Sequence, residues 1–258
     1  MGQLATHELT VRFGGHVAVN AVSCAFEPGT LTAIVGPNGA GKTTYFNLIS
    51  GQLKASSGTV TLGGQDLSGQ SPSQRTRAGL GRAFQLTNLF PRLTVLENVR
   101  LAVQATREGS HRRGLNLWSI WSDHQDLLDR ADQILQQVAM ADKAHVLVAS
   151  LPHGDQRKLE VALLMALESK VFMFDEPTAG MNAAEAPVIL NLIRKLKADP
   201  TKTILLVEHK MDVVRELADR IIVLHNGMLM ADGEPEAVIA SPVVQQAYLG
   251  LAAVEESA

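Results

Sequence analysis

A nine-residue segment near the N-terminus carries the residues with the clearest chemistry. It consists of Gly36, Pro37, Asn38, Gly39, Ala40, Gly41, Lys42, Thr43 and Thr44. The segment fits the pattern G-x-x-x-x-G-K-S/T, in which backbone N–H groups surround phosphate oxygens and the lysine reaches the β- and γ-phosphates. The Thr43 hydroxyl is then a ligand for Mg²⁺. A chance match in a glycine-rich turn is the alternative, and the flanking sequence decides between the two.

The segments on either side of this loop have the composition that a phosphate site requires. Residues 31–35 form an apolar, β-branched run typical of a buried strand, and residues 44–49 have the make-up of a helix. A helix that begins at the loop adds partial positive charge where the phosphates bind. The succession of strand, glycine-rich turn and helix predicts a nucleoside-triphosphate site.

A second set of polar residues follows two further apolar runs. Asp175 and Glu176 come directly after residues 171–174, and His209 lies two positions beyond residues 203–207. Because parallel strands gather ligand groups at their carboxyl ends, we expect these residues beside the phosphate loop. Asp175 then suits the Mg²⁺ shell, and Glu176 suits the base that orients an attacking water. His209 suits a contact with the γ-phosphate or with Glu176. The alternatives are a charge pair at a helix N-terminus for the carboxylates, and a solvated or core position for His209.

Composition narrows the class of protein. The chain has 258 residues, of which 46% are hydrophobic, enough to bury a large core. A formal net charge of −3 offers no basic field for nucleic acid, and a single cysteine excludes an internal disulfide framework. No apolar run approaches the ~20 residues that cross a bilayer, and no apolar signal segment follows the first residue. We therefore expect a soluble, cytosolic chain that does not bind nucleic acid.

The N-terminal third of the sequence predicts an antiparallel β layer. Residues 7–19 alternate between apolar and polar, with Leu9, Val11 and Phe13 on one face and a turn at Gly14-Gly15. Residues 58–62 are followed by a second pair of glycines, Gly63-Gly64. Apolar alternation bounded by glycine is typical of β-hairpins. We expect this layer to lie beside the strand that precedes the phosphate loop.

The middle of the sequence predicts a helical lobe over residues 86–163. Thr94 and Glu97 have the spacing of a capping box, in which each residue hydrogen bonds to the other's backbone N–H. A later helical face consists of Leu127, Ala131, Ile134, Leu135 and Val138. Before the lobe, Ser71-Pro72 has the pattern of a helix start.

The remaining patterns complete the predicted fold, whose class is α/β with a P-loop NTPase-like parallel sheet core, an antiparallel β layer and a helical lobe. The apolar runs 171–174, 203–207 and 221–224 are separated by helices, as in a parallel sheet. Asn226-Gly227 predicts a hairpin turn, and Ser241-Pro242 predicts the start of a last helix. We expect one domain with three parts. These are the nucleotide-binding core with its β layer (residues 1–85 and 164–240), the helical lobe (86–163), and a C-terminal helix and tail (241–258).

Taken together, the motifs stand in the order typical of the nucleotide-binding subunit of ABC transporters, and the chain resembles that family over nearly its whole length. The resemblance adds Gln85 and a signature segment to the residues above. The signature residues are Leu151, Pro152, His153, Gly154, Asp155 and Gln156. The resemblance implies that the chain binds ATP and Mg²⁺, that Gln85 touches Mg²⁺ and the attacking water, and that Phe13 stacks on adenine. For Phe13 the alternative is a core aromatic on an alternating strand.

Several segments resemble one subgroup, the ATP-binding subunits of branched-chain amino-acid uptake systems. These are residues 84–98, 156–160, 179–182, 208–212 and 247–250. The subgroup implies an ATPase that works as a head-to-tail pair, identical or paralogous, on separate membrane permease subunits. It also implies an indirect partner, a substrate-binding protein, and a peripheral position on the inner face of the cell membrane. Urea and amide importers share several of the segments and remain an alternative.

Two other classes of protein are alternatives. A lipid or lipopolysaccharide exporter ATPase shares the architecture. A non-transport ABC ATPase acting on ribosomes or DNA usually carries two cassettes or a long coiled-coil insert, and this sequence has neither. The segment from Gln85 to Asn98 favours the importer.

Three positions depart from the family pattern. Pro152 replaces the usual serine of the signature, Asn182 replaces an aspartate, and Leu163 replaces an arginine. Proline suits the start of a helix, because its φ is already set and it loses no needed donor. We therefore expect the N–H groups of His153, Gly154 and Asp155 to face the partner's phosphate, with the Asp155 carboxylate pointing away.

Two surface segments suggest contacts outside the nucleotide site. Leu89, Phe90 and Leu93 suggest an apolar contact with a permease, and a satellite core beneath the loop is the alternative. An insert at residues 112–121 places Trp118 and Trp121 near two arginines. Such a segment fits a membrane surface, or aromatic anchors that hold a loop onto the helical lobe.

Overall fold

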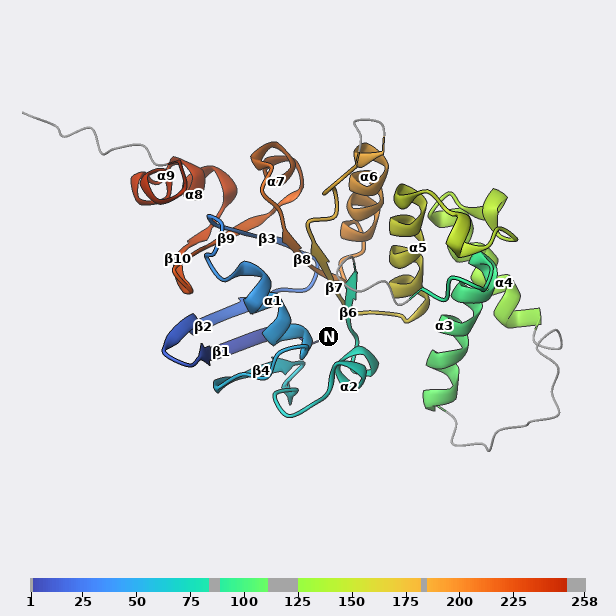
Figure 1. The fold of residues 1–258 in the computed structure, drawn as a ribbon, viewed down its shortest axis with the longest axis horizontal. Coiled ribbons are helices and arrows are strands. Elements are labelled where there is room, and N and C mark those ends of the chain that lie inside the picture. Colours follow the sequence, from blue (N-terminus) through green and yellow to red (C-terminus); the bar gives the residue numbers. More distant parts are fainter. Residues whose placement is uncertain (1, 84–88, 111–124, 182–184, 250–258) are drawn as a thin grey trace, which may run out of the picture.

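The computed structural model of the protein describes residues 2–83, 89–110, 125–181 and 185–249. Within these ranges the strands form two sheets, and a group of helices extends from one end of the molecule (Figure 1). The predicted α/β fold class is confirmed by this arrangement.

The larger sheet carries the phosphate loop. In spatial order its strands among the described residues are β10 (Met228–Gly233), β9 (Arg220–His225), β3 (Leu31–Val35), β8 (Thr203–Val207), β7 (Val171–Asp175) and β6 (Leu80–Ala83). All neighbours are parallel except the β9–β10 hairpin, which turns at Asn226-Gly227 as predicted. Every residue of β3, β7 and β8 is buried, which agrees with their continuous apolar composition.

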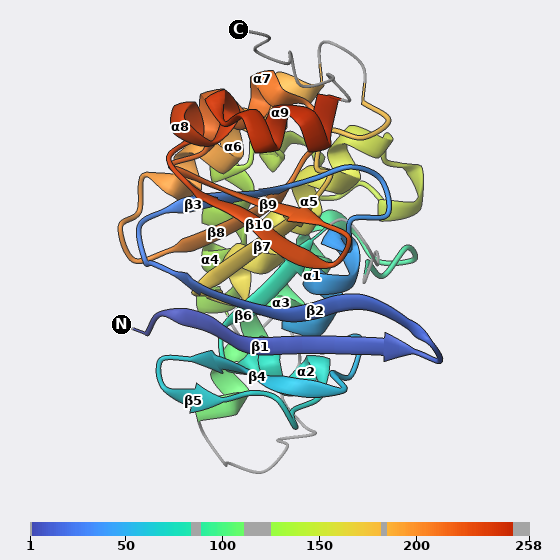
Figure 2. The same cartoon turned by 90° about the vertical axis from the view of Figure 1, so that its left-hand side faces the viewer.

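The smaller sheet is the predicted antiparallel layer. Its described strands run in the order β2 (His16–Phe26), β1 (Leu4–Phe13), β4 (Ser57–Leu62) and β5 (Gln65–Asp66). Helix α1 (Lys42–Ser50) lies between the two sheets, and its apolar side chains share one buried cluster with both. Figure 2 shows the long β1–β2 hairpin in front of α1. The layer therefore packs against the element that follows the phosphate loop.

The predicted alternation of β1 is wrong in detail. The strand begins at Leu4, and its burial runs in two blocks, residues 4–6 and 9–11, instead of every second residue. Glu8 has φ +46° at a register shift, so a bulge interrupts the pleat between the blocks. Phe13 falls beyond the second block and is 51% exposed, so it is not a core residue.

The remaining helices cover the large sheet and build the lobe. They are α2 (Pro72–Arg77), α3 (Val95–Ser110), α4 (Gln125–Gln137), α5 (His153–Ala166), α6 (Ala186–Lys197), α7 (Met211–Leu217), α8 (Pro235–Ala240) and α9 (Pro242–Leu249), with 3₁₀ turns at Ala141–Lys143 and Val148–Ser150. The predicted capping box of Thr94 and Glu97 forms, and the helix predicted to start at Ser71-Pro72 has Ser71 as its N-cap, in a capping box with Gln74 that was not predicted. None of the described helices is long and apolar enough to cross a membrane.

The helical lobe is joined to the core through α5. The predicted boundary at residue 163 falls inside α5, which continues to Ala166. One buried apolar cluster includes the predicted helical face of α4, the apolar side chains of the second half of α5, and side chains of β7 and β8 such as Phe172 and Ile204. Leu163, the leucine in an arginine position, is half-buried and packs against this cluster. The lobe is thus continuous with the core.

Strand β6 was not predicted. Its sequence, Leu-Gly-Arg-Ala, lacks the β-branched composition of the other parallel strands. It pairs with β7 from Leu80 to Ala83 and places Arg82 beside the end of that strand.

Candidate active site

Three neighbouring strands bring the predicted polar residues to one edge of the sheet. β3 and β7 both pair with β8, all in parallel, so their carboxyl ends lie together. The phosphate loop follows β3, Asp175 ends β7, and His209 follows β8. Residues 38–44 line a pocket of about 280 Å³ together with Glu176 and His209. The structure therefore brings the phosphate loop, Glu176 and His209 together.

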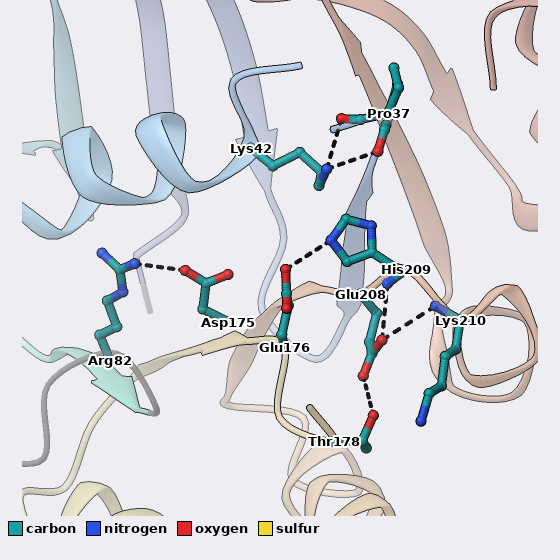
Figure 3. A network of polar contacts seen from close by, with 10 residues as sticks. Pro37, Lys42, Arg82, Asp175, Glu176, Thr178, Glu208, His209 and Lys210 are labelled. Carbon is teal, nitrogen blue, oxygen red and sulfur yellow. Dashed lines mark hydrogen bonds and ion pairs between the residues drawn. The ribbon is translucent and has the colours of Figure 1, made fainter. Parts of the chain in front are cut away.

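The phosphate loop is fixed by close backbone packing and by its own lysine. Gly36 has φ +151°, and a Cβ atom there would lie 2.1 Å from the carbonyl oxygen of Leu224, so a side chain cannot be accommodated. Lys42 Nζ donates hydrogen bonds to the carbonyl oxygens of Gly36 at 2.8 Å and Pro37 at 3.0 Å (Figure 3). An ammonium group has three N–H donors, so Lys42 is held in place while retaining capacity for a phosphate oxygen.

The charge environment of Lys42 favours an anionic ligand. Burial lowers the pKa of Lys42, and the carboxylates of Glu176 and Asp175 act in the opposite direction. A buried ammonium gains most from an opposite charge that replaces lost hydration. The phosphate groups of a nucleotide are one source of such a charge.

Glu176 lies at the mouth of the pocket in a strained conformation. Its φ is +50°, which is uncommon for a residue other than glycine, and its N–H donates to the carbonyl oxygen of Val207 at 2.9 Å. His209 Nε2 lies 2.8 Å from Glu176 Oε1 (Figure 3). Because an ionised carboxylate can only accept, the imidazole Nε2–H is the donor in this bond. Strained residues held by their surroundings are common at active sites.

Glu208 is a buried carboxylate whose contribution the sequence reasoning missed. It is 3% exposed, and its Oε1 accepts a hydrogen bond from the Thr178 hydroxyl at 2.6 Å. Its Oε2 accepts from the backbone N–H groups of His209 at 2.9 Å and Lys210 at 3.3 Å (Figure 3). Glu208 thus joins the loop after β7 to the turn that carries His209. The sequence did contain a signal for this role, because Glu208 is a charged residue directly after the buried strand β8.

Asp175 is paired with a cation that the sequence did not predict. Arg82 Nη2 donates to Asp175 Oδ2 at 2.8 Å, and Nη1 donates to Asn47 Oδ1 at 2.6 Å. The guanidinium also lies 5.6 Å from the centre of the Phe46 ring. Burial raises the pKa of Asp175 and outweighs the opposing effect of Arg82. Arg82 therefore fixes the orientation of a carboxylate that is costly to bury.

The oxygen donors near the phosphate loop fit Mg²⁺ only in company with phosphate. Thr43 lines the pocket, and Asp175 has one carboxylate oxygen beyond the one that Arg82 engages. Among the described residues no group of three metal-binding side chains forms a cage of its own. Mg²⁺ typically binds one or two protein oxygens together with phosphates and water, so this donor set is compatible with it.

Phe13 lies at the tip of the β1–β2 hairpin, opposite His16. The two residues are direct partners across the hairpin, and His16 lines the same pocket as the phosphate loop. Phe13 is thus an exposed aromatic paired with a residue of the pocket lining. His16 was missed, although the Gly14-Gly15 turn already places residues 13 and 16 side by side. Gln85 and Asn182 lie outside the described residues.

Comparison with known proteins identifies the family. Residues 19–179 match the ABC transporter family. The chain belongs to the ABC transporter family. The predicted family is confirmed by this match.

Individual relatives of this ABC transporter chain cover almost its whole length. It is 39% identical over 248 residues to the high-affinity branched-chain amino acid transport ATP-binding protein LivG of Escherichia coli, which covers 96% of this chain and 97% of LivG. It is 36% identical over 243 residues to BraF of Pseudomonas aeruginosa, a protein of the same description, covering 94% and 95% of the two chains. The crystal structure of the ADP conformation of MJ1267, an ATP-binding cassette of an ABC transporter, superposes with a TM-score of 0.80 at 29% identity and covers 97% and 100%.

The signature segment of this ABC transporter chain forms the start of α5. Pro152 is the N-cap, and the helix begins at His153. The Asp155 N–H donates to the Pro152 carbonyl oxygen at 3.0 Å, so this group is engaged within the turn. Of the three backbone N–H groups expected to face a phosphate, only those of His153 and Gly154 therefore remain. Pro152 and His153 are exposed, whereas Gly154 is buried.

The Asp155 carboxylate is bonded to two lysines. It accepts from Lys158 at 2.9 Å and also from Lys143, so two cations neutralise it. Burial acts to raise the pKa of Asp155, but these two hydrogen bonds hold it below its usual value. The negative charge next to the signature is therefore compensated within the chain.

The role of Glu208 is testable by separating turnover from nucleotide binding. Glu208→Gln replaces acceptor oxygen by an amide NH₂ that faces donors, so the turn carrying His209 must shift. We expect kcat for ATP hydrolysis to fall about tenfold or more, equivalent to ~1.4 kcal/mol of barrier, while the Kd for ATP changes by less than about twofold. Glu236→Gln on exposed α8 surface is the matched control and should leave both unchanged. Equal loss in kcat and binding would instead indicate general unfolding, and an unchanged kcat would contradict the positioning role.

Proposed function

We propose that this chain is the ATP-hydrolysing subunit of an importer for branched-chain, hydrophobic amino acids. The observation that carries the ATPase assignment is the hydrogen-bonded pair of Glu176 and His209 at the mouth of the phosphate-loop pocket. The 39% identity to LivG over 96% of the chain supports the branched-chain substrate. A urea, amide, lipid or lipopolysaccharide transporter, or a ribosome- or DNA-directed ATPase, has no comparable support among these relatives.

In the proposed reaction, the residues of the pocket hold the triphosphate and orient water. The phosphate loop and Lys42 bind the β- and γ-phosphates, and Phe13 stacks on the adenine. Thr43 and Asp175, with the predicted contribution of Gln85, would hold Mg²⁺, which would supply positive charge to the phosphate oxygens. Glu176 accepts a hydrogen bond from the attacking water, and this bond directs a lone pair of the water oxygen at the γ-phosphate. His209 donates to Glu176 and so limits the orientations of its carboxylate.

The hydrolytic role is tested by comparing two substitutions. Glu176→Gln keeps the shape of the side chain but weakens its ability to accept the water proton. We expect turnover to fall on the order of 10²–10⁴-fold with ATP binding retained, whereas Lys42→Ala should weaken nucleotide binding itself. Steady-state ATPase assays and nucleotide titrations measure the two effects. Near-normal turnover of Glu176→Gln would contradict the assignment of Glu176 as the base that orients the water.

A second cassette completes the site in this proposal. The chain has one phosphate loop and one signature segment, so a head-to-tail pair, identical or paralogous, places each signature opposite the other's nucleotide. The N–H groups of His153 and Gly154 and the positive end of the 14-residue helix α5 would then face the partner's γ-phosphate. Pro152 provides no side-chain donor, so the backbone carries this contact.

The backbone contact predicts different tolerance at two neighbouring positions. Pro152→Ser should change saturated ATPase by less than about tenfold, under ~1.4 kcal/mol of barrier, because no hydroxyl contact is in use. Gly154→Asp should abolish ATP-driven dimer closure, measured by size exclusion in the Glu176→Gln background. A Cβ atom at Gly154 would lie 3.2 Å from the carboxyl group of Glu185, so an aspartate adds like charge as well as bulk.

Gly154→Ala is the matched control, since it adds the Cβ atom without the charge and should retain part of the closure. A hundredfold gain in turnover from Pro152→Ser would show that the missing hydroxyl matters. An active, dimerising Gly154→Asp protein would show that the segment does not meet the phosphate.

The proposed permease contact is centred on Phe90. Its side chain is 56% exposed, while its backbone is fixed by Asn98, which accepts from the Phe90 N–H at 2.8 Å and donates to the Phe90 carbonyl oxygen at 3.2 Å. Backbone bonds from Val148 and Ala149 tie the neighbouring turn, which exposes 51% of Leu147, to the same loop. Leu89 packs against the core cluster, so the expected patch is narrower than the sequence indicated. A rigidly held, exposed aromatic is a common interface anchor.

The contact is tested by the coupling between transport and hydrolysis. Phe90→Ser should leave the isolated subunit folded, with unchanged basal ATPase, and should reduce co-purification of hydrophobic permease subunits and substrate uptake at least about tenfold, since anchor residues at an interface cost 2 kcal/mol or more. Val243→Ser removes an equally exposed apolar side chain (59%) from α9 and is the control. Loss of the thermal transition in Phe90→Ser would assign the residue to a local core. Co-purification of ribosomal proteins in place of permeases would contradict the importer.

A further inference from the structure

A pocket of about 650 Å³ lies at the edge of the large sheet that is opposite the phosphate loop. Its lining includes Phe172 of β7 and Thr203, the first residue of β8, whereas Glu176 and His209 follow the carboxyl ends of the same two strands. The rest of the lining comes mainly from α4, the end of α5 and α6, and Figure 1 shows α5 between the other two helices. Pockets of roughly 300–1,000 Å³ bind drug-sized molecules, so this volume suits a small organic ligand.

The buried part of the lining, called here the apolar floor, is mostly aliphatic. Its aliphatic side chains are Ile134 from α4, Met165 from the last turn of α5, and Leu192 and Leu196 from α6. Phe172 is the one aromatic residue among the described lining residues, and its buried ring lies 5.9 Å from Lys202 Nζ. The described lining therefore offers no free aromatic face on which a nucleotide base could stack. An aliphatic body fits this floor better than a nucleoside does.

The charged residues around the apolar floor are mostly cations. They are Arg130, Lys170, Lys195 and Lys202, against the two carboxylates of Glu168 and Asp199. The side chains of the first three are exposed and have no ion-pair or hydrogen-bond partner among the described residues. Asp199 Oδ1 already accepts hydrogen bonds from the Thr201 N–H at 2.9 Å and the Thr201 hydroxyl at 2.6 Å. The lining thus carries a surplus of two positive charges, which favours an anionic ligand.

Lys202 is the cation whose position the structure fixes. Its Nζ donates to the carbonyl oxygen of Ser169 at 3.1 Å, and its side chain is half-buried over the Phe172 ring. An ammonium group has three N–H donors, so two remain for a ligand. A cation that is held in place and partly removed from water binds an anion more strongly than one that is free in solvent. Lys42 is held by backbone carbonyl oxygens in a similar way at the phosphate loop.

We propose that this pocket binds an aliphatic phosphate monoester, whose phosphate is held by Lys202 and whose alkyl chain lies on the apolar floor. A phosphate monoester carries a charge of about −1.5 to −2 at pH 7, which nearly balances the two surplus positive charges of the lining. A carboxylate would balance only one of them. The ligand would contact α4 of the helical lobe and α6 of the core together, and would so hold these two parts in their described arrangement. The site is independent of the proposed ATPase function.

Binding is tested with octyl phosphate on the purified full-length chain, by calorimetry and by the thermal transition. We expect saturable binding with a Kd of about 1 mM or lower, and a rise in Tm, because a ligand that binds only the folded chain stabilises it. Hexyl phosphate should bind about two- to fourfold more weakly for each CH₂ group removed, the range for a partly to fully buried methylene. No saturable binding of octyl phosphate would overturn the proposal.

Three further probes separate the parts of the ligand. Glycerol 3-phosphate lacks the alkyl chain and octyl glucoside lacks the charge, so each should bind at least about tenfold more weakly than octyl phosphate. Octanoate carries one negative charge in place of nearly two, and should bind at least about threefold more weakly. Binding of glycerol 3-phosphate or octanoate as tight as that of octyl phosphate would overturn the proposed ligand class.

Two variants connect binding to this pocket. Lys202→Gln removes the fixed charge and should weaken octyl phosphate binding at least about tenfold, the loss expected for a charge-assisted hydrogen bond. Lys195→Gln, at an exposed position of α6, leaves the packing intact and should weaken binding about threefold. Lys54→Gln, at an exposed lysine outside the pocket, is the matched control and should bind like the original chain. Unchanged binding in both Lys202→Gln and Lys195→Gln would overturn the site.

Lys42→Ala distinguishes this pocket from the phosphate loop. Octyl phosphate should bind to this variant as it does to the original chain, because Lys42 lies at the opposite edge of the sheet. A tenfold loss of affinity in Lys42→Ala would place the ligand at the phosphate loop and overturn the proposal. The comparison requires no ATPase activity, so it decides the pocket even if the proposed function fails.

The same headgroup occurs in soluble alkyl phosphates and in the lipid phosphatidic acid. Flotation with phosphatidylcholine vesicles, with and without phosphatidic acid, separates the two sources. Flotation that requires phosphatidic acid and is lost in Lys202→Gln would support the pocket with a membrane lipid as its ligand. Binding of octyl phosphate without such flotation would support it with a soluble ligand, and binding of neither probe would overturn it.

Discussion

The hydrogen-bond ladders on the two sides of β8 are the constraint on which the site depends. β8 pairs in parallel with β3, from Ile204 opposite Leu31 to Val207 opposite Ile34, and with β7, where Val207 is opposite Asp175. These registers set the level at which the phosphate loop, the carboxylates and the histidine emerge. A slip of one residue would turn every side chain of a strand to the other face. All residues of β8 are buried. A slip of this strand would therefore move His209, which follows it, either into the core or out of the pocket.

The second constraint is the control of negative charge around a site that must accept more of it. Asp175, Glu176, Glu208 and Asp155 all lie near surfaces where phosphate is proposed to bind, and each is bonded to specific donors. The donors are the Arg82 guanidinium, the His209 imidazole, the Thr178 hydroxyl with two backbone N–H groups, and two lysines. A carboxylate bonded to fixed donors has a defined orientation, and its field acts in a known direction. Because these four carboxylates are bonded to donors of their own, they compete less with the phosphates for the cations of the site.

The sequence predicted the parts of this arrangement that are local. The phosphate loop, the buried strand before it, the helix after it and the capping box of Thr94 and Glu97 depend on residues a few positions apart, and all of them form. β6 was missed because its stability comes from pairing with β7, almost 90 residues later, and not from its own composition. Arg82 was missed for the same reason, since its partner Asp175 is 93 positions away. The alternation in β1 failed because Glu8 adopts a left-handed conformation that nothing in its side chain requires.

The helix α5 has a mechanical consequence. It begins at Pro152, on the surface proposed to face a partner, and its last turns lie directly on β6, where a Cβ atom at Gly81 would come within 2.9 Å of Leu164. A 14-residue helix is about 21 Å long and does not compress along its axis. A displacement imposed at Pro152 must therefore reappear at the far end as a push or a tilt against β6. The next residue of that strand is Arg82, which holds Asp175. In the proposed pair, a force that the partner subunit applies at Pro152 would therefore reach Asp175, beside this chain's own phosphate loop.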